Sequence, residues 1–526
     1  MELLTLVSAN QLVVLFKSDE PFVLLDTRET AIFARGHILG STNIPLSFLE
    51  TSVESLIPDF ATKIILAADD GRTVEFARAG LESLGYQNIL DLQGGVAAWA
   101  LAGYVLFSGT NVLSKAFGEY IEDKLSTPCI TAQDLKNWQD TGKPFLLLDG
   151  RTPHEHNDYC IPGAFHCANG DLPLITETLR SNPELPVVVH CAGRTRSIIG
   201  SQVLRDSDLE NPVYALKNGT IDWVAAGYPL EFGVNRPFLS NTKVQLESSV
   251  NFAKSRLRDY GIVELNLEQV GKLTQSCKTV YLFDIRSAAE YESGSLENAQ
   301  NVAGGQLVQT TDQYIAVRNS AIVLCDDDHI RATYVAIWLK RMGWRNIYTH
   351  SLDQGNCCLQ KPPTYVTHGD TITGHELAGK LNETSICIVD LRRSPDYVQQ
   401  HIPGAQFFLR QPGKNYDCLP LDKTIVLVAH ESEKYTSLVA GEIVDTGRKV
   451  QTLTGGMQDW VENRFPVESD NHRFLCHPVD VSPGVEDYQD HRVIYREGKR
   501  YLNWEIELLD LLENEPAAMF STVPIP

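Results

Sequence analysis

The most constraining feature of the chain is a short motif that occurs four times. In each occurrence an apolar run ends in Asp-x-Arg: VLLDTR at Asp26, LLLDGR at Asp149, YLFDIR at Asp284 and CIVDLR at Asp390. The four aspartates lie 123, 135 and 106 residues apart in a chain of 526 residues. Solenoid repeats are much shorter, at about 20–45 residues, whereas steps of this size are typical of whole domains. The repetition therefore predicts four small domains in tandem.

Each unit also alternates short apolar runs with amphipathic stretches. A second strand-like run occurs in KIILAADDG, PVVVHCAGR, AIVLCDDDH and TIVLVAHES, while TRSIIGSQVLRD and RATYVAIWLKRMG have the spacing of helices. This alternation predicts an α/β fold in which each mostly parallel sheet is flanked by helices on both faces. We expect domains over residues 1–108, 123–233, 258–360 and 370–468. In the tail, residues 469–526, YLNWEIELLDLLENE predicts a helix that packs against the body.

Charge and cysteine usage narrow the classes of function. A formal net charge of −22 argues against nucleic acid or an anionic membrane surface as a partner. The first residues, MELLT, lack the basic start of a signal peptide, and no apolar run reaches the about 18 residues of a membrane span. We therefore expect a cytoplasmic protein. The eleven cysteines are irregularly spaced and form no CxxC pair, so we expect reduced thiols, no metal site and no cofactor.

One cysteine stands where α/β sheets bind their ligands. In VVVHCAGRTRSIIG, Cys191 ends a strand-like run and precedes a short loop and a helix-like segment. The amides of the loop and the helix N-terminus favour an anion there, and Arg194 and Arg196 add positive charge. We therefore expect a lowered pKa for Cys191 and a thiolate that acts as a nucleophile on an anionic substrate.

The other three units carry no cysteine at the matching place. AADDGRT places Ala68 there, CDDDHIR places Asp326 there with Arg331 at the end of the loop, and VAHESEKY offers Ala429 or His430. Acidic loops in the first and third units would repel the anions that the second loop attracts, so we expect inactive copies. A shift of the alignment by one residue in the third unit would place Cys325 at the position of Cys191. Cys325 and Arg331 are therefore a possible second site.

The Asp-x-Arg pairs themselves are predicted to be structural. Each aspartate would tie down the loop after its strand, and each arginine would pair with a nearby acid such as Glu29 or Glu155. The pairs recur in the units that lack the cysteine, so they do not depend on its chemistry.

Taken together, these features resemble the rhodanese domain of sulfurtransferases. The resemblance rests on Asp-x-Arg, on the turn GHILGSTNIP from Gly36 and on CAGRTRS from Cys191, and it covers nearly the whole chain in the manner of four-domain bacterial sulfurtransferases. It implies that Cys191 takes sulfur from a small anionic donor such as thiosulfate, holds it as a persulfide, and passes it to cyanide, a thiol or a protein cysteine. The implied cradle consists of Ala192, Gly193, Arg194, Thr195, Arg196 and Ser197. In it, Arg194 would bind the donor and Arg196 would close the loop.

The length of the loop separates two chemistries. Cys191 and Arg196 are spaced as C-x4-R, which resembles the loop that cradles a sulfur atom. Phosphatases of related fold carry H-C-x5-R, and Ser197 stands where their arginine would be. We therefore favour sulfur transfer over a phosphatase or an arsenate reductase. The alternative from another class is a scaffold or sulfur-relay protein without enzymatic activity, in which the three inactive copies bind partners.

Overall fold

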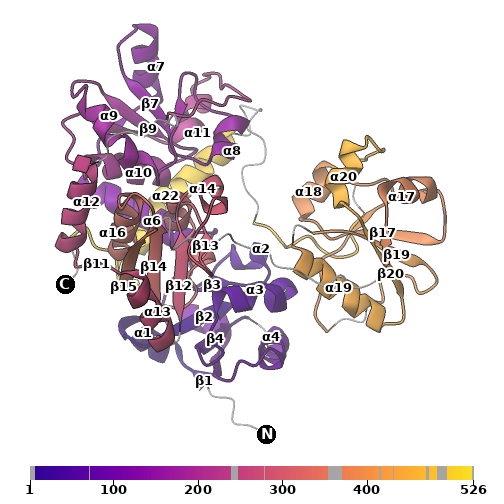
Figure 1. The fold of residues 1–526 in the computed structure, drawn as a ribbon. Coiled ribbons are helices and arrows are strands. Elements are labelled where there is room, and N and C mark those ends of the chain that lie inside the picture. Colours follow the sequence, from indigo (N-terminus) through magenta and orange to yellow (C-terminus); the bar gives the residue numbers. More distant parts are fainter. Residues whose placement is uncertain are drawn as a thin grey trace.

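Four parallel sheets, one for each Asp-x-Arg motif, form the framework of the chain (Figure 1). The computed structural model describes residues 6–69, 71–238, 247–277, 279–352, 370–413, 416–430, 432–469, 473–482 and 494–523. The first sheet has the strand order β1-β5-β4-β2-β3, and the other three repeat this order. Every pairing between named strands is parallel. The predicted α/β class with four parallel sheets is confirmed.

The elements follow one another in the same sequence in each unit. The first unit contains β1 (Leu6–Val7), α1 (Ala9–Lys17), β2 (Phe22–Asp26), α2 (Thr30–Phe33), β3 (Thr42–Asn43), η1 (Leu46–Phe48), α3 (Leu49–Leu56), β4 (Lys63–Ala67), α4 (Gly71–Ser83), β5 (Ile89–Leu92) and α5 (Gly95–Leu101). The second contains β6 (Cys129–Ile130), α7 (Ala132–Asp140), β7 (Leu146–Asp149), α8 (Pro153–Asp158), β8 (Phe165–His166), η2 (Leu172–Ile175), α9 (Thr176–Arg180), β9 (Val187–His190), α10 (Thr195–Arg205), β10 (Val213–Leu216) and α11 (Gly219–Ala225). The third contains β11 (Val263–Glu264), α13 (Leu267–Ser276), β12 (Val280–Asp284), α14 (Ala288–Glu292), β13 (Gln300–Asn301), α15 (Gly304–Gln309), η3 (Thr311–Gln313), β14 (Ala321–Asp326), α16 (Arg331–Arg341) and β15 (Asn346–Ser351). The fourth contains β16 (Asp370–Ile372), α17 (Gly374–Lys380), β17 (Ile386–Asp390), α18 (Ser394–Gln399), β18 (Gln406–Phe407), β19 (Thr424–Val428), α19 (Glu433–Asp445), β20 (Lys449–Leu453) and α20 (Gly456–Glu462).

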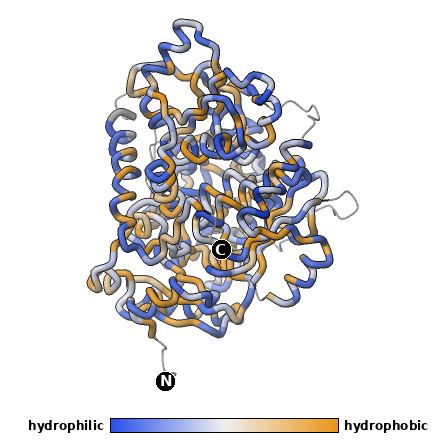
Figure 2. The backbone as a smooth tube through the Cα atoms, turned by 90° about the vertical axis from the view of Figure 1, so that its left-hand side faces the viewer, coloured by the Kyte–Doolittle hydropathy of each residue, from blue (hydrophilic) through white to orange (hydrophobic). Residues whose placement is uncertain are grey.

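Helices cover both faces of the sheets, which is clearest in the fourth unit, where α19 lies on one side and α17, α18 and α20 on the other (Figure 1). A parallel sheet covered in this way buries its central strands completely, so they read as continuous apolar runs. All four residues of β9 and all five of β2 are buried. Along the chain, apolar stretches run through the middle of the body and alternate with polar segments at its edges (Figure 2). One hydrophobic cluster extends through the first three units, and the fourth has clusters of its own.

Two connecting helices and the C-terminal tail lie outside the repeats. α6 (Val112–Leu125) links the first two units and α12 (Glu247–Asp259) leads into the third. The tail returns to the body of the first three units as a π-helix, η4 (Ile494–Gly498), and then α22 (Lys499–Leu511), which packs against α6 (Figure 1). The predicted helix of the tail is thus confirmed. No helix in these described segments or elsewhere among the described residues is long and apolar enough to cross a membrane.

The Asp-x-Arg motif makes the same buried fork in every unit. The arginine returns its guanidinium to its own aspartate, with N–O distances of 2.6 Å in the first and third units, 2.8 Å in the second and 2.7 Å in the fourth. It also donates to the backbone carbonyl eight residues further on, those of Gly36, Tyr159, Gly294 and Gln400. The structural role is therefore as predicted.

The expected partners of these arginines are wrong. Glu29 accepts hydrogen bonds from the amide and hydroxyl of Ser47, and Glu155 binds Arg196. The physical reason is local: the aspartate at the strand end also accepts the backbone N–H of the arginine two residues on, at 3.0–3.1 Å, which folds the guanidinium back onto the same carboxylate. In the first and third units the arginine also pairs with an acid other than the expected glutamates: Arg28 with Asp69 at 2.9 Å and Arg286 with Asp327 at 3.3 Å.

The fourth unit allows a matched test of this fork. We expect Arg392→Ala to lower the free energy of opening of β17 by about 3 kcal/mol, because it leaves the fully buried Asp390 without its cation. The measurement is amide hydrogen exchange of β17 and β18. Arg393→Ala is the control: this arginine is 54% exposed and its pair with Asp396 should contribute less than about 1 kcal/mol. Equal loss of protection in both variants would contradict the expected cost of leaving the buried Asp390 without its cation.

Candidate active site

Cys191 lies directly beyond the second sheet. His190 is the last residue of β9 and pairs in register with Asp149 of β7, so Cys191 is the first residue after the carboxyl edge. The loop then runs to Arg194, and α10 begins at Thr195. This is the edge at which parallel α/β sheets bind ligands. Only 2% of Cys191 is exposed.

The carbonyl groups of the loop are held by the N-terminus of α11. The Cys191 carbonyl accepts the N–H of Thr220 at 2.9 Å, and the Ala192 carbonyl accepts that of Ile221 at 3.1 Å. This contact requires glycine at 219, because its φ is +54° and a Cβ there would lie 2.3 Å from the Cys191 carbonyl oxygen. With the carbonyls engaged by α11, the groups that favour a thiolate at Cys191 are the Arg196 guanidinium and then the Ser197 N–H and hydroxyl.

Both arginines of the loop are paired with carboxylates. Arg194 donates from Nε and from one terminal nitrogen to Glu119 of α6, each at 2.7 Å, and it also binds Glu122. Arg196 forms a bidentate pair with Glu155 of α8, at 2.7 and 2.8 Å. Burial opposes ionisation of Glu155, but the Arg196 guanidinium lowers its pKa to about 2. The two arginines thus hold the loop to α6 and α8, and their charges are compensated.

The expectation of a lowered pKa for Cys191 is wrong. Burial raises the pKa of the thiol above its usual value, although the Arg196 charge and hydrogen bonding from Ser197 act in the opposite direction. Glu505 of the tail raises it further. The sequence pattern shows the two arginines but neither the carboxylates that neutralise them nor the helix that closes over the thiol.

That helix is α22, and its residues are the part of the site that the sequence-based prediction missed. Glu505 accepts hydrogen bonds from the Thr195 hydroxyl at 3.3 Å and from the Tyr501 hydroxyl at 2.9 Å. Trp504 passes over Gly109, where φ is +92° and a Cβ would lie 2.5 Å from the indole. The one signal in the sequence is spacing: Glu505 falls on the same buried stripe as Leu502 and Leu508.

A cavity of about 820 Å³ lies between the loop and the tail helix. Its walls come from the first unit, the segment before α6, the loop, Gln309 of the third unit and α22; they include Ala31, Ala34, Arg35, Lys115, Cys191, Ile221, Arg500, Tyr501, Trp504 and Glu505. Lys115 is buried, and its ammonium lies 5.3 Å from the centre of the Trp504 ring. Arg35 and Arg500 are exposed, and neither forms an ion pair within the described part of the chain. The cavity therefore combines apolar walls with cationic groups and with two acids, Glu497 and Glu505. The cations suit an anionic ligand.

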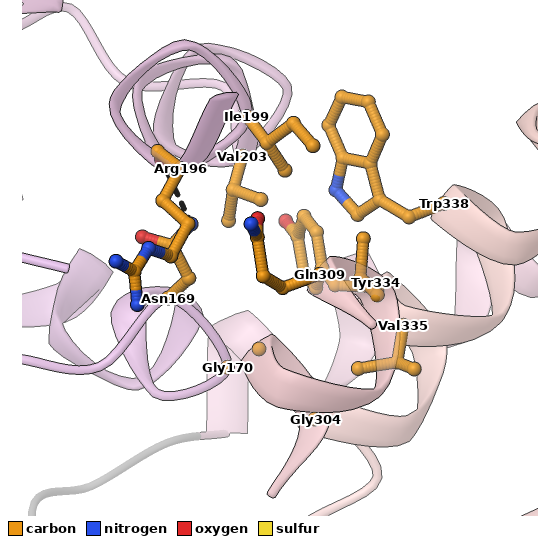
Figure 3. Close-up of a pocket in the computed structure, with 12 residues that line it drawn as sticks. Asn169, Gly170, Arg196, Ile199, Val203, Gly304, Gln309, Tyr334, Val335 and Trp338 are labelled. Atoms are coloured by element: carbon orange, nitrogen blue, oxygen red, sulfur yellow. Dashed lines mark hydrogen bonds between the residues drawn. The ribbon is translucent and has the colours of Figure 1, made fainter. Parts of the chain in front are cut away.

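The third unit also supports α10. Ile199 and Val203 of α10 face Tyr334, Val335 and Trp338 of α16 (Figure 3). The space between them is only about 20 Å³, room for about one water molecule. The Asn169 side chain donates to the Arg196 carbonyl at 2.8 Å, which fixes the first turn of the helix (Figure 3).

Strand register identifies the equivalent positions in the other units. The residues that pair with the motif aspartates are Ala67, His190, Cys325 and Val428, so Ala68, Asp326 and Ala429 occupy the place of Cys191. Cys325 is fully buried inside β14, level with His190, in a hydrophobic cluster with Val323 and Leu352. This placement favours a structural role for Cys325.

The loop of the third unit is filled by its own carboxylates. Asp326 accepts the N–H groups of His329 and Ala332 at 3.1 and 2.9 Å, and Asp328 accepts those of Ile330 and Arg331 at 2.7 and 2.9 Å. Arg331 itself binds Glu290 of α14 through two bonds of 3.0 Å, as Arg196 binds Glu155. A carboxylate thus occupies the amide cradle that an external anion would need.

The chain was compared with known proteins and structures. The family model of the rhodanese-like domain matches residues 8–102, 131–226, 266–355 and 373–463. The crystal structure of thiosulfate sulfurtransferase from Pseudomonas aeruginosa is similar over 99% of this chain and 100% of its own, with 31% identity and a TM-score of 0.89. Two further structures are similar over about one unit. The Alr3790 protein from Anabaena sp. has 26% identity over 20% of this chain and 82% of its own, with a TM-score of 0.18. A protein of unknown function from Rhodopseudomonas palustris has 27% identity over 22% of this chain and 93% of its own, with a TM-score of 0.19. No curated protein matches the chain.

The compensation of Arg196 by Glu155 can be tested directly. We expect Glu155→Gln to lower the pKa of Cys191 by about one unit, because the guanidinium would act on the thiol uncompensated. Glutamine retains the capping box with Thr152, so α8 should persist. The measurement is the pH dependence of Cys191 alkylation by iodoacetamide. Glu231→Gln, which removes the half-exposed partner of Arg236 outside the cavity, should leave the midpoint unchanged; an unchanged midpoint in Glu155→Gln as well would refute the compensation.

Proposed function

The chain belongs to the family of rhodanese-like domain proteins, and we propose that it is a sulfurtransferase in which Cys191 carries sulfur as a persulfide. The observation that carries this proposal is the placement of Cys191, which is the one cysteine among the four equivalent loop positions and lies in the cavity. The similarity of the whole chain to a thiosulfate sulfurtransferase supports the same reaction class.

The proposed reaction has two displacements at sulfur. The Cys191 thiolate attacks the outer sulfur of a donor such as thiosulfate; a bond forms between the two sulfurs, the bond to the sulfonate breaks, and sulfite leaves with the electron pair. An acceptor nucleophile, such as cyanide, a thiol or a protein cysteine, then attacks the outer sulfur of the persulfide and restores the thiolate. The two displacements transfer sulfur without any net oxidation or reduction, so the reaction needs no redox cofactor.

The residues around Cys191 have different roles in the proposed reaction. Arg35, Arg500 and Lys115 would attract the anionic donor into the cavity. The Ser197 amide and the N-terminus of α10 would stabilise the persulfide anion. Because Arg194 and Arg196 are already paired with carboxylates, we assign them to the shape of the loop and not to the charge of the donor.

Sulfur loading is measurable by intact mass. Incubation with thiosulfate should add about 32 Da, the mass of one sulfur, and cyanide should remove it. The added sulfur should map to Cys191, since no other cysteine of the four units occupies the loop position.

Two variants control this experiment. Cys191→Ser should show no mass gain and lose thiosulfate:cyanide transfer by about a thousandfold or more. Cys325→Ser should load like the wild type, because Cys325 lies inside β14. Full transfer activity in Cys191→Ser would overturn the proposal, and loading that depends on Cys325 would move the site to the third unit.

A further inference from the structure

Glu505 is a buried carboxyl group that faces the active-site loop without full hydrogen bonding. It is 1% exposed, and its Oε1 accepts from Thr195 and Tyr501. Its Oε2 has no hydrogen-bond partner among the described residues and lies 3.1 Å from the position of a Cβ on Gly193, two residues after Cys191. A buried carboxylate oxygen without a partner is unfavourable, so its persistence at this place calls for a function.

The charges around Glu505 leave one buried cation, Lys115, beside Glu505, Cys191 and the buried Asp312. The ionisable groups that face it are Lys115 and Glu119 of α6, Cys191, Arg194 and Arg196 of the loop and α10, and Tyr501 of its own helix. Arg194 is compensated by Glu119 and Arg196 by Glu155. The remaining buried cation is Lys115, whose charge favours ionisation of Glu505, although burial lowers the pKa of Lys115 itself. Burial nevertheless raises the pKa of Glu505 to about 7, and it also raises that of Cys191.

Two negative charges on side chains as deeply buried as Cys191 and Glu505 are unfavourable, because each loses its hydration. We propose that Glu505 accepts the proton of the Cys191 thiol when the persulfide forms, so that the pair carries a single negative charge throughout turnover. This proposal rests on the proposed function. It makes the tail helix part of the reacting system and assigns Glu505 a role beyond closing the cavity.

The step balances in atoms and charge. Before the step, the thiol is neutral, Glu505 carries one negative charge and thiosulfate carries two. After it, the persulfide carries one negative charge, Glu505 is neutral and sulfite carries two, so the total charge is unchanged. The S–H proton moves to the carboxylate as the new sulfur–sulfur bond forms and the old one breaks. When an acceptor removes the outer sulfur, the thiolate that returns takes the proton back from Glu505.

Proton release during loading tests this step. At pH 8 Glu505 is ionised in the unloaded protein, since its pKa is about 7. Loading wild-type protein with thiosulfate should then release almost no proton from the protein, whereas Glu505→Gln should release about one proton per sulfur bound, measured with a pH indicator in weak buffer. Proton uptake by sulfite is common to both. The matched control is Glu507→Gln, an exposed acid on the same helix, which should behave like the wild type. Equal proton release in wild type and Glu505→Gln would overturn the proposal.

An infrared measurement needs no variant that might fail to fold. Sulfur loading of the wild type at pH 8 should produce the C=O band of a protonated carboxyl group and remove a carboxylate band, and cyanide should reverse both. Absence of these bands in protein that has gained the mass of one sulfur would overturn the proposal.

A third readout is independent of sulfur transfer. Alkylation of Cys191 by iodoacetamide requires the thiolate, which ionised Glu505 opposes above pH 7. The wild-type rate should therefore rise less than tenfold per pH unit between pH 7 and 9, while Glu505→Gln should approach tenfold and be about ten times faster near pH 8.5. A uniform acceleration at every pH would indicate mere loosening of α22 and count against the proposal. If no sulfur loads at all, the proposed function fails, and this profile still decides the coupling between the two acids.

Discussion

The buried fork between Asp149 and Arg151 is the contact on which the geometry of the site depends. It fixes the turn after β7 by engaging the strand end and the Tyr159 carbonyl together. The same turn starts α8, and Glu155 of its capping box binds Arg196 and so ties the active-site loop to α8. A buried ion pair contributes little net stability, but it tolerates only one arrangement of the chain around it. The fork therefore specifies the shape of the loop more than it stabilises the unit.

The third unit shows that this frame is independent of chemistry. There the fork of Asp284 and Arg286 leads to α14, and Glu290 binds Arg331 in the same manner. Asp326 accepts the amide N–H groups of the loop between these contacts, which an external anion would otherwise bind. The cysteine position of this unit thus holds a buried carboxyl group, which keeps the buried amides of the loop hydrogen-bonded. This copy retains a structural use, because its α16 packs against α10 of the second unit (Figure 3).

Sequence patterns predicted the repeated fold and the position of the loop, because both depend on local features. Buried parallel strands read as continuous apolar runs, and the Asp-x-Arg spacing determines its own ion pair. The charge state of the site could not be predicted in the same way. Glu505 lies 310 residues from Thr195, which it contacts, and Glu119 lies in a linker helix outside the repeat. Periodicity identifies the buried stripe of such a helix but not the surface that it will cover. The fourth unit illustrates the same limit: Arg410 bridges Glu50 of the first unit and Glu442, a contact that no motif indicates.

The burial of Cys191 changes what makes its thiol reactive. An open loop with unpaired arginines would lower the pKa of its cysteine, and the thiolate would be present before the substrate arrives. Here the arginines are compensated and burial raises the pKa of Cys191, so the resting protein holds a neutral thiol. A neutral thiol is less exposed to adventitious oxidation, since the thiolate is the reactive form. In the proposed step the thiolate forms when the donor binds, and Glu505 takes the proton within the cavity. The first unit, the third unit and the tail together provide the enclosure that buries both groups.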